Sequence, residues 1–259
     1  MSAQLKSSSL GQTMVLTLSN PSQRNALGPA IYAAGIEALN VAESNPDIRS
    51  VILTGEGSMF CAGGDLNRLQ ANRQEAPAVQ AQGLDQSHSF IEAIRTFPKP
   101  VIAAVEGAAA GAGFSLALAC DFIVAASDAV FVMSYGQVGL SPDGGASWHL
   151  AQALPRQLAS ELLLGAERIH ASRLHVLGLV NRVSEPGHAL DTAQALAEQL
   201  NAKAPNALAS GKELLEAAAR NSLHTQLSEE REHFVRNLHL PNAGIGIAAF
   251  LGRRTPEFE

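Results

Sequence analysis

Two stretches of small residues indicate the fold: Phe60-Cys61-Ala62-Gly63-Gly64-Asp65-Leu66 and Gly107-Ala108-Ala109-Ala110-Gly111-Ala112-Gly113. A short apolar run precedes each stretch, at residues 51–54 and 101–105, and each run predicts a buried strand. The second stretch leads into an apolar segment, residues 114–120, that predicts a helix. A unit of strand, small-residue loop and helix therefore occurs twice, around 51–69 and 101–125. This repetition predicts an α/β fold in which the units stack as a spiral.

Periodic patterns predict further strands and helices. Residues 13–19 alternate like a strand, and residues 29–43 have helical spacing with Pro29 suited to the first turn. Residues 67–82 are mostly polar and predict a mobile helix–loop segment, followed by a helix over 84–97. Residues 107–113 are expected to form a loop, and further strands are expected over 121–125 and 129–133. Beyond Pro142, helices are predicted over 144–153, 156–164, 171–177, 189–202, 206–220 and 223–238.

The composition favours an enzyme that acts on small molecules. The chain has 259 residues, 46% of them apolar and 16% charged, which is enough for one large core. A net charge of -6 without runs of Lys and Arg argues against a nucleic-acid partner. Two cysteines, Cys61 and Cys120, are too few for a disulfide framework. Residues 1–10 lack the apolar core of a secretory signal, and no apolar run reaches the ~20 residues that cross a bilayer. We therefore expect a cytoplasmic protein without a membrane partner.

Motifs for redox cofactors and metals are not found. Gly111-Ala-Gly-Phe-Ser-Leu116 begins like a dinucleotide fingerprint but lacks the third glycine, and there is no Walker-type phosphate loop. The eight histidines are scattered without the spacing of metal ligands. The sequence therefore predicts neither a metal site nor a redox cofactor.

The two small-residue stretches expose backbone that a ligand can approach closely. Where such a loop opens a helix, unpaired N–H groups and the helix dipole favour negative charge. Two N–H groups directed at one thioester oxygen would stabilise an enolate by about 3 kcal/mol per donor. The alternative for either loop taken alone is tight packing, because glycine and alanine also let helices and strands meet.

Several short motifs follow one another along the chain: Asn20-Pro-Ser-Gln-Arg-Asn-Ala-Leu27, Phe60-Cys-Ala-Gly-Gly-Asp-Leu66, Lys99-Pro-Val-Ile-Ala-Ala-Val-Glu-Gly107, Gly111-Ala-Gly113, Ala119-Cys-Asp121, Gly139-Leu-Ser-Pro-Asp-Gly-Gly145 and Gly178-Leu-Val180. Their order and spacing resemble the crotonase (enoyl-CoA hydratase/isomerase) superfamily over about residues 10–255. The resemblance implies a crotonase-like (ClpP/crotonase) spiral of repeated ββα units with a helical C-terminal trimerisation region, assembled as a homotrimer or a dimer of trimers. We place the catalytic core at residues 1–197 and the oligomerisation region at 198–259.

The resemblance also implies where an acyl-CoA thioester substrate binds. Gly64 and Ala112 match the residues whose backbone N–H groups form the family's oxyanion hole. Coenzyme A is part of the substrate, and no other cofactor is required. The CoA moiety would lie along Arg24, Ala26 and Leu27, with its adenine near Ala62, Asp65 and Leu66.

One carboxylate matches a catalytic position of the family. The two glutamates that hydratases of the family use to add water are missing, and Ser115 and Tyr135 stand in their places. Neither is an acid or base near neutral pH without help. Asp143 instead resembles the single acid of the phenylacetate-pathway enoyl-CoA isomerases, whose motif also contains a tryptophan, here Trp148. One group suffices for an isomerase, because it moves a proton between two carbons of the substrate. The alternative for Asp143 is a turn or helix N-cap.

We therefore expect an enoyl-CoA isomerase in which Asp143 relays the proton and Ser115, Tyr135 and His88 shape the pocket. An atypical hydratase is the first alternative. His88 also resembles a functional histidine of the aromatic acyl-CoA dehalogenases, in which an aspartate matching Asp143 attacks the ring. Two remoter alternatives are a serine hydrolase with Ser115 as nucleophile and a non-catalytic acyl-CoA-binding protein.

Overall fold

Six strands form one large, mostly parallel sheet in the computed structural model, which describes residues 3–259. Residues 1–2, where the segment examined for a secretory signal begins, lie outside it. The strands follow the order β1 (Gln4–Leu10), β2 (Thr13–Ser19), β3 (Ser50–Gly55), β4 (Val101–Val105), β6 (Phe122–Ala126) and β9 (Arg182–Ser184). Only β1 is antiparallel to its neighbour. The predicted strands at 13–19, 51–54, 101–105 and 121–125 all belong to this sheet.

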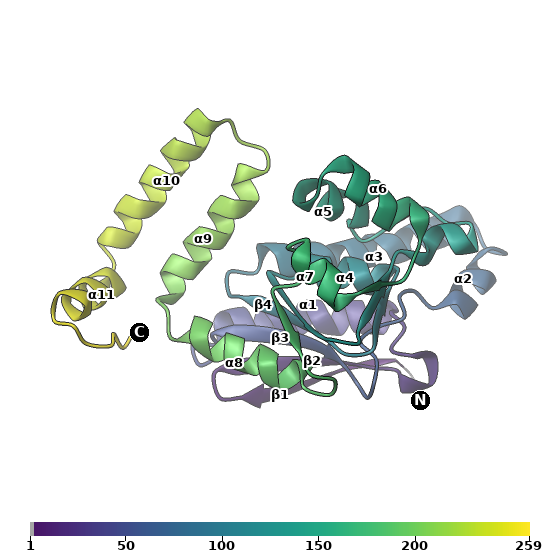
Figure 1. The fold of residues 1–259 in the computed structure, drawn as a ribbon, viewed down its shortest axis with the longest axis horizontal. Coiled ribbons are helices and arrows are strands. Elements are labelled where there is room, and N and C mark those ends of the chain that lie inside the picture. Colours follow the sequence, from purple (N-terminus) through teal and green to yellow (C-terminus); the bar gives the residue numbers. More distant parts are fainter. Residues whose placement is uncertain (1–2) are drawn as a thin grey trace.

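Alternating side chains of this sheet form two apolar layers. On one face, Val15, Ile52 and Ile102 pack against α8 (Ala189–Asn201). The opposite face contributes to the main core, which also includes α1 (Pro29–Ser44) and α3 (Pro77–Thr96). These two helices cross closely, because a β-carbon at Gly35 would lie only 2.3 Å from the ring of Phe90. The sheet thus lies between α8 and the pair α1–α3 (Figure 1).

A second, smaller sheet includes part of the stretch 107–113, which was expected to be a loop. It consists of β5 (Ala108–Ala110), β7 (Val130–Val132) and β8 (Ile169–His170). The loop prediction is wrong for residues 108–110, because β5 pairs with β7 on one side and Ala109 bridges to Cys61 on the other. Helix α4 (Ala112–Ala119) then begins two residues before the predicted start at 114.

The polar segment at 67–82 is more helical than its pattern predicts. It contains α2 (Leu66–Asn72) and the first turns of α3, which begins at Pro77 rather than at residue 84. Pro77 suits the first helical turn, and the polar side chains around it face outward. The remaining predicted helices correspond to α5 (Ala146–Ala153), α6 (Arg156–Gly165), α7 (Ala171–Val176), α9 (Pro205–Ala218) and α10 (Leu223–Leu238), and α11 (Pro241–Leu251) was not predicted.

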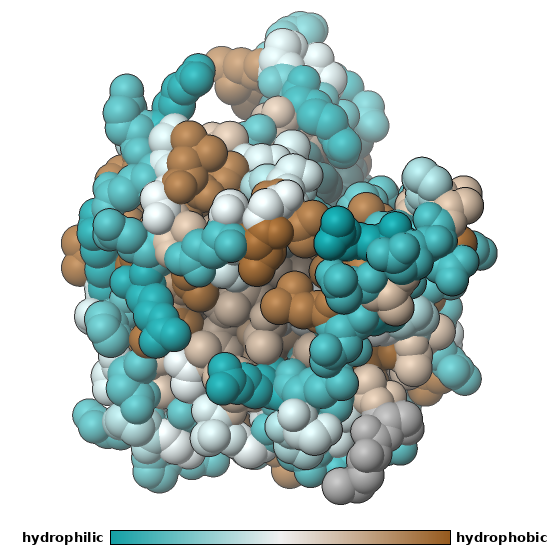
Figure 2. Space-filling model, turned by 90° about the vertical axis from the view of Figure 1, so that its right-hand side faces the viewer, coloured by the Kyte–Doolittle hydropathy of each residue, from teal (hydrophilic) through white to brown (hydrophobic). Residues whose placement is uncertain are grey.

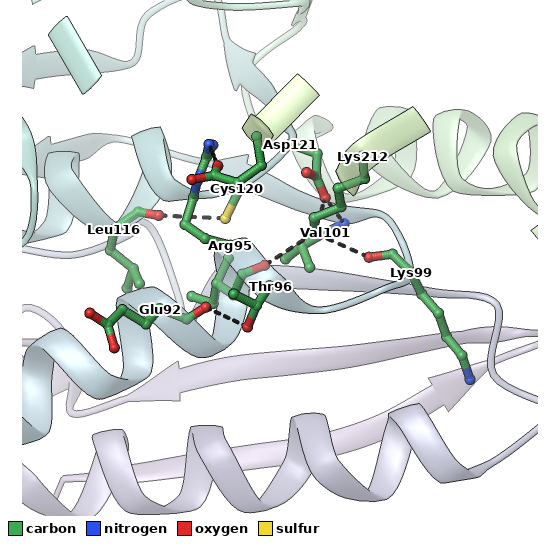
Figure 3. Close-up of polar contacts among 11 residues, drawn as sticks. Glu92, Arg95, Thr96, Lys99, Val101, Leu116, Cys120, Asp121 and Lys212 are labelled. Carbon is green, nitrogen blue, oxygen red and sulfur yellow. Dashed lines mark hydrogen bonds and ion pairs between the residues drawn. The ribbon is translucent and has the colours of Figure 1, made fainter. Parts of the chain in front are cut away.

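The C-terminal helices α9, α10 and α11 extend away from the sheet (Figure 1). Lys212 on α9 forms an ion pair of 2.7 Å with Asp121, which also accepts a hydrogen bond from the Val101 N–H (Figure 3). Burial raises the pKa of Asp121 although Lys212 opposes this shift. A second ion pair joins Arg95 of α3 to Glu216 of α9. The predicted boundary between 197 and 198 falls inside α8, and it stays a prediction.

Exposed apolar side chains gather on these C-terminal helices. They include Leu215, Leu223, Leu227, Phe234, Val235, Ile247, Phe250 and Leu251.

Across residues 3–259, every helix is too short or too polar to cross a bilayer.

Candidate active site

Two loops, residues 24–27 and 61–64, come together next to β5. The loop at 24–27 joins the loop at 61–64 through hydrogen bonds from the Leu27 N–H to the Gly63 carbonyl (2.7 Å) and from the Ala62 N–H to the Arg24 carbonyl (3.0 Å). The predicted CoA-binding residues of both loops are therefore neighbours. The side chains of Ala26 and Leu27 are buried, so these two residues can offer only backbone to a ligand.

The loop at 61–64 also pairs with β5. The Cys61 N–H donates to the Ala108 carbonyl (3.0 Å), and the Ala110 N–H donates back to the Cys61 carbonyl (2.9 Å). A β-carbon at Gly63 would lie 3.3 Å from the Ala112 nitrogen. The structure therefore brings together the two small-residue stretches, including Gly64 and the start of α4.

Packing explains some glycines of these loops but not Gly64. A β-carbon at Gly63 would lie 2.6 Å from the Ala110 carbonyl oxygen, and Gly63 has a φ of +94°. A β-carbon at Gly113 would lie 2.5 Å from the Cys61 carbonyl oxygen. At Gly64 the nearest atom would be Cδ1 of Leu69, at 3.8 Å. Open space therefore lies beside Gly64, which tight packing does not require to be glycine.

The N–H groups of Gly64 and Ala112 are available to a ligand. Within residues 3–259 neither group donates a hydrogen bond. Ala112 is the first residue of α4, where backbone N–H groups have no partner in the helix and the helix dipole is positive. Both N–H groups can therefore donate to a developing negative charge.

Asn25 holds the first loop in place, a role that its sequence motif alone does not show. It is buried, and its side-chain amide donates to the carbonyls of Glu56 (2.9 Å) and Met59 (2.7 Å). Arg24 and Asn25 both have left-handed backbone, with φ of 53° and 57°. Asparagine tolerates this conformation better than most residues, which explains its place in the motif.

Asp143, Tyr135 and Ser115 form one hydrogen-bonded group. The Tyr135 hydroxyl donates to Oδ1 of Asp143 at 2.5 Å. Ser115 on α4 lies 3.1 Å from the Tyr135 hydroxyl, and its Oγ donates to the Asp143 carbonyl at 3.1 Å. Ser115 and Tyr135 are buried, whereas Asp143 is half-buried. The group is therefore attached to the helix that begins at Ala112.

A glycine turn presents Asp143 to its partners. Gly144 and Gly145 have φ of +58° and +79°, and a β-carbon at Gly144 would lie 3.0 Å from Cβ of Ser115. The N-cap of α5 is Gly145, which makes no side-chain capping bond. The Asp143 side chain is hydrogen-bonded to Tyr135 instead of capping the helix. Asp143 therefore lies in a turn but is not a helix N-cap.

Burial controls two titratable groups near this turn. The pKa of Tyr135 is raised, first by burial and then by the negative charge of Asp143, so its hydroxyl stays protonated as a donor. Burial, together with the nearby charge of Arg95, lowers the pKa of His149 to about 4. His149 is therefore neutral at physiological pH.

A cavity of about 650 Å³ lies along α2, beside the Tyr135 loop. Its wall includes Leu66 and Leu69 of α2 together with Val138 and Leu140. A β-carbon at Gly64 would meet Leu69 first, at 3.8 Å, so the cavity and the space beside Gly64 share this side chain. On the side of the molecule that carries α2, hydrophobic side chains gather around a hollow with a hydrophilic rim (Figure 2).

Two predicted site residues have other surroundings than expected. Asp65 caps α2, because its Oδ1 accepts hydrogen bonds from the N–H groups of Asn67 (2.9 Å) and Arg68 (3.3 Å). His88 is exposed on α3, and its side chain makes no hydrogen bond within residues 3–259. The structure does not join His88 to Asp143, and its role in the pocket stays a prediction.

Tyr32 of α1 is buried in the core and is not among the residues singled out from the sequence. Burial raises the pKa of Tyr32, and the charges of Arg68 and Asp143 act on the same hydroxyl in opposite directions. Helical spacing predicts that Tyr32 faces the core but does not show which loops approach it. Among residues 3–259, no cluster of His, Cys, Asp or Glu side chains could hold a metal ion.

Comparison with known proteins identifies the family. Residues 10–259 match the family model for enoyl-CoA hydratase/isomerase. The chain is 36% identical over 250 residues to 1,2-epoxyphenylacetyl-CoA isomerase of Escherichia coli (strain K12), covering 95% of this chain and 94% of that protein. It is 33% identical over 248 residues to 2,3-dehydroadipyl-CoA hydratase of the same organism, covering 96% and 95%. A crystal structure of an enoyl-CoA hydratase from Polaromonas sp. JS666 is 70% identical, with a TM-score of 0.98 over 99% of this chain and 100% of that chain.

The chain therefore belongs to the enoyl-CoA hydratase/isomerase (crotonase) family. The predicted α/β crotonase fold is confirmed, with two mixed sheets and C-terminal helices. The protein is an acyl-CoA enzyme that acts as a hydratase or an isomerase.

Proposed function

We propose that the protein shifts the double bond of an enoyl-CoA through an oxyanion-stabilised enolate, with Asp143 as the acid and base. The observation that carries this proposal is the position of a single carboxylate beside the helix that begins at Ala112. Tyr135 holds Oδ1 of Asp143, and Oδ2 accepts no hydrogen bond within residues 3–259. One oxygen is therefore fixed, and the other is available to a substrate proton.

Gly64 and Ala112 supply the two N–H groups that bind the thioester oxygen. Both are without an acceptor in residues 3–259, and open space lies beside Gly64. When a proton leaves the α-carbon, negative charge moves onto this oxygen, and each preorganised donor stabilises it by about 3 kcal/mol. The cavity along α2 gives the acyl chain an apolar surface.

Asp143 moves one proton between two carbons. In a 3-enoyl-CoA, its carboxylate takes a proton from the α-carbon and leaves a dienolate. The same group then returns the proton to the γ-carbon, the double bond moves to the α,β position, and the carboxylate is restored. No water and no cofactor enter this reaction, so a single acid–base group suffices.

The CoA moiety lies along the loop at 24–27, with its adenine near Ala62, Asp65 and Leu66. Arg24 is exposed there and can contact a phosphate of CoA. Leu66 is 56% exposed and offers apolar surface to the adenine. Asp65 supports this surface indirectly, because it caps α2.

An enoyl-CoA hydratase with an atypical site is the second candidate. The names of the 33%-identical relative and of the 70%-identical structure favour it. Family hydratases use two carboxylates to add water, however, whereas Asp143 is the single one proposed here, and neither the protonated Tyr135 hydroxyl nor the buried Ser115 replaces the second. A serine hydrolase is disfavoured as well, because within residues 3–259 Ser115 is hydrogen-bonded to Tyr135 and to backbone carbonyls but to no histidine.

Family resemblance and the exposed apolar side chains of α9–α11 support a homotrimer or a dimer of trimers, and we place this assembly in the cytoplasm. A protein of this kind needs the acyl-CoA thioester as its substrate and no nucleic acid or membrane.

Proton exchange in heavy water tests the enolate step directly. We expect the protein to exchange α-protons of a saturated acyl-CoA for deuterium, which proton NMR detects, and the Asp143→Asn variant to lose this exchange. Tight binding of the thioester without exchange in the unmodified protein would favour a non-catalytic acyl-CoA-binding protein instead.

A further inference from the structure

The turn that carries Asp143 is supported mainly from one side. The chain that leads into it, residues 136–142, is exposed throughout. On its other side the turn continues directly into α5, which is partly buried. Gly144 and Gly145 allow the left-handed backbone of the turn, and glycine has the largest backbone freedom of all residues. The position of the turn therefore depends on how α5 is held.

Two aromatic side chains of α5 connect the turn with the outer side of this helix. The ring of His149 lies 3.2 Å from the position that a β-carbon on Gly145 would occupy, and the His149 N–H donates to the Gly145 carbonyl (2.9 Å). The Trp148 ring meets the His149 ring edge-on, with 5.1 Å between the ring centres and 86° between the ring planes. A displacement of Trp148 would therefore act on the ring that packs against the turn.

Arg95 joins these rings to α9. It lies in the last turn of α3, and its guanidinium carbon is 5.3 Å from the centre of the Trp148 ring. The same guanidinium forms an ion pair with Glu216 of α9, and the two side chains are only 28% and 26% exposed. Partial burial strengthens both interactions, because water screens the charges less. One cation thus contacts both α5 and α9.

A cavity of about 480 Å³ shows that these groups surround one space. Its wall includes Arg95, Trp148 and His149, together with Leu215 and Ala218 of α9. The charge of Arg95 also contributes to the lowered pKa of His149, after burial. Because open space lies between α5 and α9 here, the connection between the two helices at this place runs through Arg95 rather than through close apolar packing.

Resting on the proposed function, we propose that Arg95 is a positioning residue for Asp143. With Glu216 on one side and Trp148 on the other, it ties α9 to the helix that follows the Asp143 turn. The carboxylate must reach two carbons of the substrate, and small displacements of a catalytic group reduce the rate strongly. Docking of α9 on the core therefore affects the rate of proton transfer. The thioester is held by the oxyanion loops, so its affinity should change little.

Fluorescence tests the link without any substrate, because Trp148 is the only tryptophan of the chain. Glu216→Gln changes a side chain of α9 and leaves Trp148 and Arg95 in place. We expect the emission of Trp148 to change in Glu216→Gln and in Arg95→Met, and Glu216→Gln to add no further change in the Arg95→Met background, since both act through one path. The control Arg173→Met breaks the ion pair with Glu161 of α6 and should leave the emission unchanged. Unchanged emission in Glu216→Gln would overturn the link.

Steady-state kinetics tests the positioning role. With a 3-enoyl-CoA we expect Arg95→Met to lower kcat about 10-fold and to leave KM within about twofold. Arg95→Lys should recover part of the loss, because lysine keeps the charge that pairs with Glu216 but not the planar guanidinium. Arg173→Met should have the kcat of the unmodified protein. A lower stability with normal kcat, or a raised KM with normal kcat, would overturn the proposal, because Arg95 would then act on the fold or on binding alone.

The positioning role and the proposed function fail in different ways. If the unmodified protein does not move the double bond, the proposed function fails, and the positioning role falls with it. If the double bond migrates and Arg95→Met has normal kcat, only the positioning role is wrong. If Arg95→Met does not fold, Glu216→Gln carries the same kinetic prediction from the other side of the ion pair, and normal kcat in that variant would overturn the proposal.

Discussion

The hydroxyl of Tyr135 donates a hydrogen bond of 2.5 Å to Oδ1 of Asp143. The two residues come from opposite ends of the segment between β7 and α5, and Ser115 of α4 contacts both. This relationship fixes the carboxylate at the start of the helix whose first N–H is free. The chain lacks both hydratase glutamates but has in Asp143 one carboxylate held in a fixed position, which we propose as the acid–base group.

Replacing Asp143 by asparagine should abolish most turnover. The amide has nearly the same shape but cannot accept the proton, and positioned acid–base groups contribute about 100- to 10,000-fold to rates. Steady-state kinetics should show this fall in kcat, with the dissociation constant for a non-reactive acyl-CoA within about threefold of that of the unmodified protein. Near-normal turnover would remove Asp143 from its proposed role.

Replacing Tyr135 by phenylalanine should weaken catalysis without weakening binding. The variant loses the hydrogen bond that fixes Asp143, and a hydrogen bond to a charged group contributes about 1.5–3 kcal/mol. We expect kcat to fall about 10- to 100-fold and KM to change little. Ser115→Ala is the matched control, because it keeps the Tyr135–Asp143 bond and should have a smaller effect. A larger effect of Ser115→Ala would mean that the serine positions the carboxylate.

Two glycine variants should differ in stability. In Gly113→Ala the new methyl group would lie 2.5 Å from the Cys61 carbonyl oxygen, so the loops must move apart. We expect the free energy of unfolding to fall by about 1–3 kcal/mol, as in overpacked cores. In Gly64→Ala the atom nearest to the new methyl group is 3.8 Å away. The free energy of unfolding should therefore change by less than about 0.5 kcal/mol. Urea titrations would measure both, and equal losses would contradict the open space at Gly64.

Acid should destabilise the fold through His149. Its pKa is about 4 in the folded protein and about 6.5 when unfolded, so the unfolded chain binds the extra proton between these values. The stability present above pH 6.5 is therefore lost as the pH falls toward 4, by up to about 1.4 kcal/mol per pH unit. Urea titrations across this range should show that the free energy of unfolding depends less on pH in His149→Gln than in the unmodified protein. An unchanged dependence would contradict this account, and His170→Gln, which removes an exposed imidazole, is the control.

Charged substitutions on the C-terminal helices should break the expected assembly. Phe234 and Phe250 are 70% and 85% exposed in the single chain, and a trimer would bury them. Light scattering after size-exclusion chromatography should give at least three times the 27.1 kDa of one chain and a lower mass for Phe234→Glu with Phe250→Glu. A monomeric unmodified protein would contradict this prediction.

The sequence predicted most of the core because its buried strands and helices have clear periodicity. It missed β1, whose side chains are almost all exposed and therefore show no alternation, and β9, which has only three residues. The prediction of a loop over 107–113 is partly wrong, because the pairing partners of β5, namely β7 and Cys61, are distant in sequence and no local pattern shows the pairing.

The candidate site was predictable where a short motif specifies its own backbone. Gly64, Ala112 and Asp143 lie in such motifs, and the structure places them around α4. Tyr32 lies outside the motifs, and its burial depends on the packing of α1 against Phe90 of α3. No spacing in the sequence shows that packing, nor that Asp65 caps a helix.

The most direct test of the central claim is the product formed from a 3-enoyl-CoA and from a 2-enoyl-CoA, identified by mass spectrometry and proton NMR. We predict that the double bond migrates and that the mass of the thioester does not change, because Asp143 only relays a proton. A product heavier by one water molecule, without migration, would contradict the account and show that the protein is a hydratase with another base.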